Sequence, residues 1–344
     1  MSIDISKFRN IISNIKKANI FTHPFPDPDA IGSMMGMKWI FSKLGIESEL
    51  FYFGGISHPQ NKSMVNLLDL ELTQSDNYAY RDCDFNVLVD TIPNNAGINQ
   101  QEIQFNLVID HHKESPNNFD GLYINLKAGS ACATVYNLIE NLELKFDEDN
   151  QVDSKVATAM MIGITTDTEF LMSDDCSDYE FIAWSRLFPY RDSLLLKQII
   201  NFERPKFWID SKATACSKAV VEESVGVVGM GIIPSKHRDM IADMADEMVT
   251  WEDINTAVVF ALVDGNRIEG CVRTKASSVS VPSLCQELGG KYGKGGGKLG
   301  KGAYKYDLAG ACIDEDEDEE IKQNYWDLFE KKEIKRVFKI IRNK

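Results

Sequence analysis

The segment FTHPFPDPDAIGS, residues 21–33, lies between an apolar, strand-like run and a helical pattern. It carries three side chains of the types that bind metal ions in proteins: His23, Asp27 and Asp29. Its prolines keep the segment out of a helix, so these side chains are expected on a short loop that follows a strand. One loop cannot complete a metal site, so further ligands must come from other parts of the chain.

The first half of the chain alternates strand-like and helical patterns, which predicts an α/β fold with a parallel sheet and helices on both of its faces. The predicted strands are 18–23, 47–53, 85–90 and 105–110, and the predicted helices are 30–45, 129–142 (with Ser130 as N-cap) and 154–168. Further ligand types follow these elements: Asp90 ends NVLVD, Asp110, His111 and His112 end NLVIDHH, and Asp167 ends GITTD.

Each of these side chains alone has an ordinary structural explanation, such as a turn, a helix cap or a solvated surface. Their joint occurrence favours function, because ligands bind beyond the carboxyl ends of parallel strands, where side chains distant in sequence converge. We therefore expect them to form one site.

The motifs THPFPDPDAIGS, VLVDT, IDHH and GITTDT, in this order, resemble those of the DHH phosphoesterase family. Within that family the chain is most similar to the oligoribonuclease/pAp-phosphatase (nanoRNase) branch, which has a C-terminal DHHA1 domain. The resemblance implies a DHH catalytic domain at 1–188, a connecting helix or linker at 189–212, and a smaller mixed α/β DHHA1-like domain at 213–313, across a cleft. An acidic run and an amphipathic helix would occupy 314–344. A hairpin turn is predicted at Gly265 and Asn266.

The resemblance also assigns roles to the candidate ligands. His23, Asp27 and Asp90 would hold one metal ion, and Asp29, Asp90, His111 and Asp167 a second, with Asp90 bridging. Asp110 would orient its neighbours, and His112 would face the substrate phosphate. A mixed imidazole and carboxylate set suits Mn²⁺ better than Mg²⁺, with Co²⁺ as a further candidate. Two ions about 3.5–4 Å apart would activate a hydroxide for attack on phosphorus.

Substrate binding is expected in the second domain, at the basic, glycine-rich stretch GGKYGKGGGKLGKGAYKY, residues 289–306. Read as a loop, it would bring the backbone of Gly295, Gly296 and Gly297 and the charge of Lys298 to an anion. Family members carry a GGGH-like sequence there, so Lys298 replaces a histidine. A flexible low-complexity loop is the alternative.

Two more residues are candidates for substrate contact. Arg273 follows a predicted strand in GCVRTK, where its alternative is an edge charge at the surface. His58 lies in GGISHPQNKSM, residues 54–64, a segment that either lines the cleft or uses Asn61 and Ser63 to cap a helix.

The formal net charge of -15 excludes long polyanions as natural partners, because duplex binding depends on many Lys and Arg contacts to phosphates. A small nucleotide or a short single-stranded oligonucleotide is compatible with it. No apolar run reaches the ~18 residues of a membrane span, and the seven cysteines form no CxxC pair. We therefore expect a cytoplasmic protein without a membrane partner.

The C-terminal segment IKQNYWDLFEKKEIKRVFKIIRNK, residues 321–344, has the pattern of an amphipathic helix. The residues expected on its apolar face are Tyr325, Leu328, Phe329, Ile334, Val337, Phe338 and Ile341. This face would pack on the parent domain or on the mate of a homodimer.

The leading hypothesis is a two-metal phosphoesterase that hydrolyses short oligonucleotides, linear dinucleotides or pAp-like nucleotides to 5′-mononucleotides. The second is an inorganic pyrophosphatase or polyphosphatase with the same metal centre. The third is a catalytically silent nucleotide-binding regulator, against which the complete ligand set argues.

Overall fold

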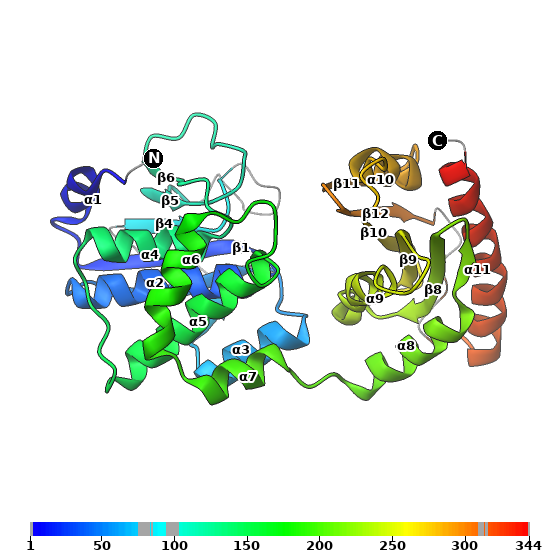
Figure 1. Cartoon of the computed structure of the whole chain (residues 1–344), viewed down its shortest axis with the longest axis horizontal. Helices are drawn as coiled ribbons and strands as arrows, with labels where there is room; N and C mark the ends of the chain where they lie inside the picture. Colours follow the sequence, from blue (N-terminus) through cyan, green and yellow to red (C-terminus); the bar gives the residue numbers. More distant parts are fainter. Residues whose placement is uncertain are drawn as a thin grey trace. The chain divides into compact units, whose positions relative to one another are not determined.

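The computed structural model describes residues 3–74, 83, 85–93, 103–308, 313 and 316–342. The chain divides after Glu203 into two compact units, which are described separately here (Figure 1). The segment 189–212, expected to connect two domains, is shared between the units. The helix at its start belongs to the first unit, and the helix that begins at Lys206 belongs to the second.

A six-stranded, all-parallel sheet forms the centre of the first unit. Its strands, in spatial order, are β3 (Leu72–Gln74), β2 (Glu47–Phe53), β1 (Lys17–Pro24), β4 (Phe85–Val89), β5 (Leu107–Ile109) and β6 (Leu122–Ile124). The predicted parallel sheet is confirmed, while the short edge strand β3 and the short β6 were not predicted from the sequence. The order reverses between β1 and β4, and such a switch point opens a crevice at the carboxyl ends of the strands.

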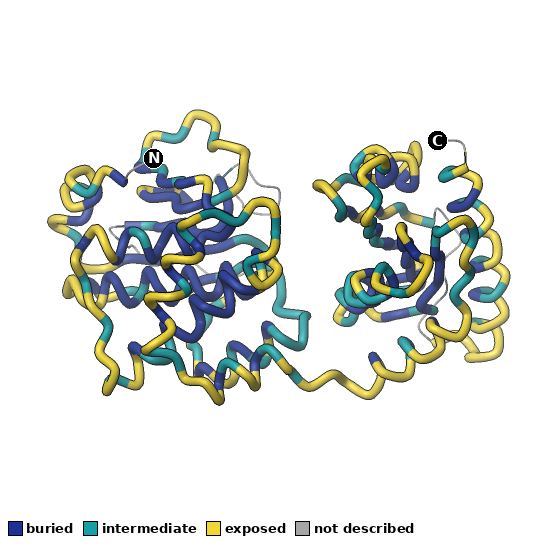
Figure 2. Tube along the Cα trace, in the orientation of Figure 1, coloured by how far each residue is buried: buried dark blue, intermediate teal, exposed yellow. Residues whose placement is uncertain are grey.

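The helices of this unit pack on one face of the sheet (Figure 2 shows the buried strands and inner helix faces). They are α1 (Ile5–Ile12), α2 (Pro28–Lys43), α3 (Pro59–Leu68), α4 (Ala131–Asn141), α5 (Gln151–Asp167), α6 (Asp178–Leu187) and α7 (Ser193–Ile200), with a 3₁₀ turn at Phe188–Tyr190. Asp27 caps α2, and Pro28 fits its first turn, so the helix begins two residues before the predicted start at 30. Ser130 caps α4 as predicted.

The opposite face of the sheet differs from the expectation of helices on both faces. In the described part of the chain it is covered by a cluster of large apolar side chains from strands and from the segment before β5. Phe21 stacks on Phe51 at 5.1 Å between ring centroids, and Phe105 meets Phe21 edge-on at 5.7 Å. Aromatic rings bury enough area for a loop segment to shield this face.

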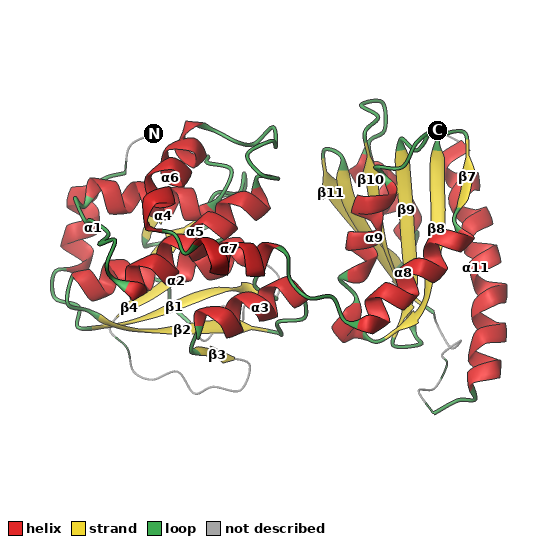
Figure 3. Cartoon of the chain, turned by 60° about the horizontal axis from the view of Figure 1, so that its bottom comes forward, coloured by secondary structure: helices red, strands yellow, loops and turns green. Residues whose placement is uncertain are grey.

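The second unit contains a mixed six-stranded sheet with helices on both faces (Figure 3). Its strands, in spatial order, are β11 (Gly293–Lys298), β12 (Lys301–Asp307), β10 (Arg267–Thr274), β9 (Thr256–Val263), β8 (Val225–Ile233) and β7 (Val220–Glu222). Only the β8–β9 pair is parallel among these strands. The predicted hairpin at Gly265 and Asn266 joins β9 to β10.

Two helices cover each face of this sheet. They are α8 (Lys206–Lys218) and α9 (Met240–Met248) on one face, and α10 (Val281–Gly289) and α11 (Glu319–Arg342) on the other, with a 3₁₀ turn at Ser235–His237. The C-terminal segment expected to be an amphipathic helix forms α11, and Leu328, expected on its apolar face, is 74% exposed and does not lie on its buried face. The start of the acidic run, at 314 and 315, lies outside the described residues.

The glycine-rich stretch 289–306 forms two antiparallel strands, β11 and β12, rather than the expected loop. A Cβ atom on Gly295 would lie 1.9 Å from the Cys285 carbonyl oxygen of α10, so the strand needs glycine to pack there. The turn needs Gly300, whose φ is +74°. The glycines therefore serve close backbone packing as well as any contact with an anion.

None of the described helices combines the length and apolar composition that a membrane span requires.

Candidate metal centre

The first group of candidate ligands lies at the end of β1 and the start of α2. His23 Nε2 is 3.3 Å from Asp90 Oδ2, and its Nδ1 lies 2.8 Å from the Pro24 carbonyl oxygen, which orients the ring. Asp27 accepts hydrogen bonds from the backbone of Asp29 (2.9 Å) and Ala30 (3.0 Å), as the N-cap of α2. Ligand atoms of His23, Asp27 and Asp90 all lie within 4.8 Å of one another. These three residues therefore form one potential metal site.

A second group brings together three elements. His111 Nε2, just after β5, lies 3.4 Å from Asp167 Oδ2 at the end of α5 and 4.0 Å from Asp29 Oδ2 in the first turn of α2. The same nitrogen is 3.3 Å from Asp90 Oδ1. Asp29, His111 and Asp167 form a cluster of ligand atoms within 4.8 Å, and Asp90 also forms one with His111 and His112. Asp90 thus belongs to the first group and contacts the second.

Asp90 occupies the centre of the site because of its backbone. It follows β4 directly, its φ is +60°, and its N–H donates a 2.8 Å hydrogen bond to the Ile109 carbonyl oxygen. A non-glycine residue in the left-handed region is uncommon, and such conformations cluster at functional sites. Here the turn directs the carboxylate of Asp90 between His23 and His111.

The electrostatics of the site are those of a cation site. Burial lowers the pKa of His23, yet its hydrogen bond to Asp90 and the charges of Asp27 and Asp90 raise that pKa to about 10. His111 likewise has a pKa of about 10, because Asp90, Asp29 and Asp167 outweigh its burial. Burial, Asp90 and Asp167 raise the pKa of Asp29 well above its ordinary value. Positive charge is thus favoured at the imidazoles, and the carboxylates repel one another.

The donor set fits divalent metal ions. Asp90 Oδ1 is buried and accepts no hydrogen bond from the described residues, which is costly unless another positive group coordinates it. Imidazole nitrogens and carboxylate oxygens together suit Mn²⁺ and similar transition metals. The structure thus places His23, Asp27, Asp29, Asp90, His111 and Asp167 in one site.

Asp110 and His112 lie at the edge of this site. Asp110 is fully buried, and its Oδ1 is 2.8 Å from His112 Nδ1. That hydrogen bond raises the pKa of His112, whose side chain is 57% exposed. Asp110 thus holds an accessible imidazole beside the buried carboxylates.

The other residues predicted to bind substrate comprise His58 in the first unit and five residues of the second unit, which is described by itself. His58 caps α3, with its Nδ1 accepting a hydrogen bond from Gln60 N at 3.1 Å, and belongs to none of the three ligand groups. Arg273 pairs with Asp246 at 2.5 and 3.1 Å. Gly295, Gly296, Gly297 and Lys298 form most of β11.

Two supporting contacts were missed by sequence reasoning. The Asn61 side chain donates a 2.9 Å hydrogen bond to the Pro26 carbonyl oxygen and so supports the loop that carries Asp27. The backbone of Ala131 and Cys132, at the start of α4, donates to the Asp29 carboxylate at 2.6 and 2.9 Å. For the second contact, the only signal in the sequence is GSAC, residues 129–132, which predicts a capped helix start. It does not indicate which side chain the helix start contacts.

Residues 17–164 match the model of the DHH family, N-terminal domain. The first unit contains a DHH-family domain. The chain is 28% identical to the uncharacterized protein MJ1633 of Methanocaldococcus jannaschii over 84% of this chain and 58% of that protein. It is 24% identical to a probable bifunctional oligoribonuclease and PAP phosphatase, NrnA, of Streptococcus mutans, over 89% of this chain and 96% of the relative.

A shorter similarity concerns the first half of the chain. A probable manganese-dependent inorganic pyrophosphatase of Lactobacillus gasseri is 25% identical over 48% of this chain and 51% of that protein. The chain therefore spans little more than half the length of this relative and of the Methanocaldococcus one. The crystal structure of an exopolyphosphatase-related protein from Bacteroides fragilis has the same fold, with a TM-score of 0.67 at 15% identity, over 87% of this chain and 89% of that one.

Proposed function

We propose that this protein is a metal-dependent phosphoesterase that hydrolyses short oligonucleotides, linear dinucleotides or pAp-like nucleotides to 5′-mononucleotides. The observation that carries the proposal is the position of Asp90, whose two carboxylate oxygens lie 3.3 Å from His23 and from His111. It thereby joins two groups of ligands at the switch point of the sheet. Two Mn²⁺ ions are the proposed cofactors.

The candidate residues would have separate roles in binding metal ions and in contacting the substrate. His23, Asp27 and Asp90 would hold one ion, and Asp29, Asp90, His111 and Asp167 the other. When bound, such ions lower the pKa of water towards about 7 and offset phosphoryl charge. The hydrogen bond to Asp110 raises the pKa of His112, and the protonated imidazole would donate a hydrogen bond to a phosphoryl oxygen and stabilise the charge that develops there.

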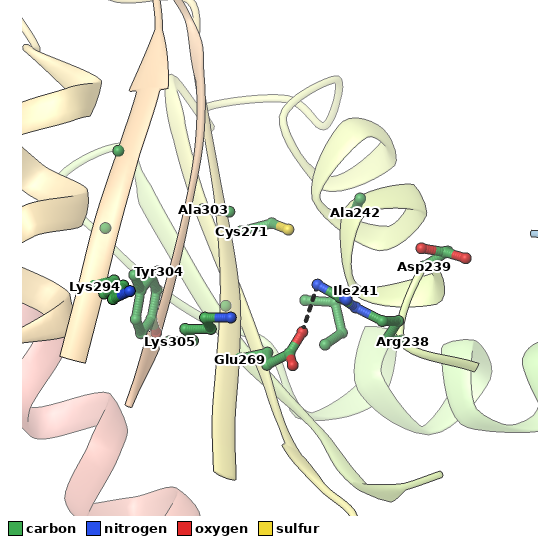
Figure 4. Close-up of a pocket in the computed structure, with 13 residues that line it drawn as sticks. Arg238, Asp239, Ile241, Ala242, Glu269, Cys271, Lys294, Ala303, Tyr304 and Lys305 are labelled. Carbon is green, nitrogen blue, oxygen red and sulfur yellow. Dashed lines mark ion pairs between the residues drawn. The ribbon is translucent and has the colours of Figure 1, made fainter. Parts of the chain in front are cut away.

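A pocket in the second unit supports a nucleotide rather than a bare phosphate chain. It has a volume of about 410 Å³, within the range of small-molecule sites. Arg238, Lys294 and Lys305 line it together with Gly295 and Gly296, and Figure 4 shows Arg238 paired with Glu269 at the pocket wall. Glycine leaves this part of β11 open, since a Cβ on Gly296 would meet no atom within 4 Å. Lys294 and Lys305 would bind a phosphate, and the open backbone at Gly296 would leave room for the attached sugar and base.

The extent of the similarities also favours nucleotides. The similarity to the Streptococcus protein named as an oligoribonuclease and PAP phosphatase runs through both units. The similarity to the pyrophosphatase covers only about half of this chain. Inorganic pyrophosphate or polyphosphate remains the second candidate, favoured by that relative and by the lysines of β11 and β12.

The decisive experiment offers Mn²⁺-loaded protein a linear diribonucleotide, pAp, pyrophosphate and tripolyphosphate in parallel, with chromatographic detection of mononucleotides and phosphate. We expect turnover of the nucleotides and none by Asp90→Ala, which should retain the wild-type circular dichroism spectrum. Turnover of pyrophosphate or tripolyphosphate alone would establish the second candidate. Binding of nucleotides without any hydrolysis would make the protein a regulator and overturn the proposal.

A further inference from the structure

The outward side of α11 carries an unusual distribution of charge. Eight of the exposed residues of α11 share one side of the helix, which we call the outer face: Glu320, Ile321, Asn324, Leu328, Lys331, Lys335, Lys339 and Arg342. Residues 316–320, which lead into the helix and include its first two residues, are all acidic and exposed, while the exposed charges from Lys331 onward on the outer face are all positive. Figure 2 shows the exposed side of the helix directed away from the sheet. One helix therefore presents both an acidic and a basic end.

Two apolar side chains on the outer face are exposed to solvent. Leu328 is 74% exposed and Ile321 54% exposed, one heptad apart. This spacing places both on the same side of the helix, between the acidic and basic ends. They give this charged side of the helix a small amount of apolar contact area.

A groove runs beside the basic end of the outer face, between α11 and the edge strand β7. Its volume is about 550 Å³. Val220, Ile334 and Phe338 supply apolar side chains, and Lys331, Lys335, Lys339 and Arg342 supply cations. In the described part of the chain, no acid forms an ion pair with Lys331, Lys335 or Lys339, although Arg342 pairs with Glu222. The groove thus suits an acidic partner with some apolar surface.

We propose that the outer face of α11 docks against the same face of a second copy of this chain. The two helices run antiparallel, with Leu328 near the two-fold axis. In this arrangement the residues 316–320 of each copy meet Lys335, Lys339 and Arg342 of the other. Each copy offers both halves of the charge pattern, so one contact type is made twice, as a two-fold interface requires.

The helix dipoles, the charged residues and the exposed apolar side chains would all favour this association. Antiparallel helices place opposite ends of their macrodipoles together, and the pairing brings opposite charges into contact. The apolar contribution is small, because each copy offers Leu328 and Ile321 rather than a broad patch. We therefore expect a weak dimer that dissociates as salt screens the charges over about 10 Å at 0.1 M and 3 Å at 1 M.

The test uses two charge-reversal variants of the full chain. One is Glu317→Lys/Glu320→Lys, and the other is Lys335→Glu/Lys339→Glu. In either variant alone, like charges would meet across the interface, whereas a mixture of the two restores opposite charges at both contacts. Sedimentation velocity across protein concentrations, at 50 mM and 500 mM NaCl, reports the association.

We expect wild-type protein to dimerise at low salt, each variant to associate at least about tenfold more weakly, and the equimolar mixture to recover the dimer. Leu328→Glu should also weaken association, while Leu194→Glu, at a 66% exposed site on α7, should not. Melting curves check that each variant folds. A wild-type monomer at all concentrations, or a mixture that stays monomeric, would overturn the proposal. So would a monomer whose Lys335 and Lys339 instead bind anionic vesicles or RNA.

Discussion

Asp29 is anchored to Cys132, 103 residues further along the chain: its Oδ1 accepts a hydrogen bond from the Cys132 N–H at 2.9 Å. Its Oδ2 accepts a second hydrogen bond, from Ala131 at 2.6 Å. The start of α4 therefore holds a carboxylate that also lies 4.0 Å from His111. The positive end of the helix dipole favours a negative charge at this position. Through this contact, the packing of α4 positions one of the candidate metal ligands.

The first prediction compares Asp29→Asn with Asp167→Asn. An asparagine amide at 29 would turn its NH₂ group towards one of two backbone donors, so we expect a loss of about 1–2 kcal/mol in unfolding free energy, reduced in part by relief of repulsion with Asp90. Asp167 is 27% exposed, so Asp167→Asn should change stability little. Both should lose bound Mn²⁺. Urea unfolding and metal analysis measure the two effects, and equal stability of the variants would contradict the assigned role of α4.

A second prediction concerns pH. The imidazoles of His23 and His111 have pKa values of about 10 without metal, so both rings are positively charged imidazolium groups at pH 7.5. A metal must displace these protons, because only the neutral imidazole coordinates. We expect Mn²⁺ binding to release protons and its affinity to rise with pH. Calorimetric titrations in buffers of different ionisation enthalpy measure the release, and heats that do not depend on the buffer would contradict it.

The third prediction concerns the close contact between α2 and α5. A Cβ on Gly163 of α5 would lie 2.9 Å from the Asp29 Cα in α2. A Cβ on Gly36 of α2 would lie 3.1 Å from the Met160 sulfur of α5, and 2.8 Å from the Val135 side chain of α4. Gly163→Ala and Gly36→Ala should each cost about 1–3 kcal/mol of stability through overpacking. Only Gly163→Ala should also weaken Mn²⁺ binding, since it displaces the backbone of a ligand. Similar metal affinity in the two variants would argue against this coupling.

The fourth prediction tests the pocket of the second unit. Lys294→Gln/Lys305→Gln should raise KM for a dinucleotide several-fold and leave kcat nearly unchanged, because these lysines would contribute ground-state binding away from the reacting phosphorus. Lys236→Gln, an exposed site that does not line this pocket, is the matched control. A fall in kcat with unchanged KM would contradict a role of this pocket in substrate binding.

Much of the first unit was predictable because local sequence encodes it. Apolar runs specify β1, β2, β4 and β5, and the residue that follows a parallel strand must lie at the carboxyl edge of the sheet. That rule suffices to bring Asp90 and His111 near His23. The second unit was less predictable, because glycine-rich β11 has no apolar periodicity to mark it as a strand.

The sequence by itself determined which residues form the candidate metal centre, since turn chemistry and strand periodicity act over a few neighbouring residues. Only the tertiary structure decided what holds those residues and which contacts the other candidate residues make. Asp29 accepts a hydrogen bond from the N-terminus of α4, His58 caps α3, and Arg273 pairs with Asp246. Leu328 remained exposed on α11. The long-range contacts follow from how helices and strands pack, and packing depends on shapes and distances that no local pattern in the chain records.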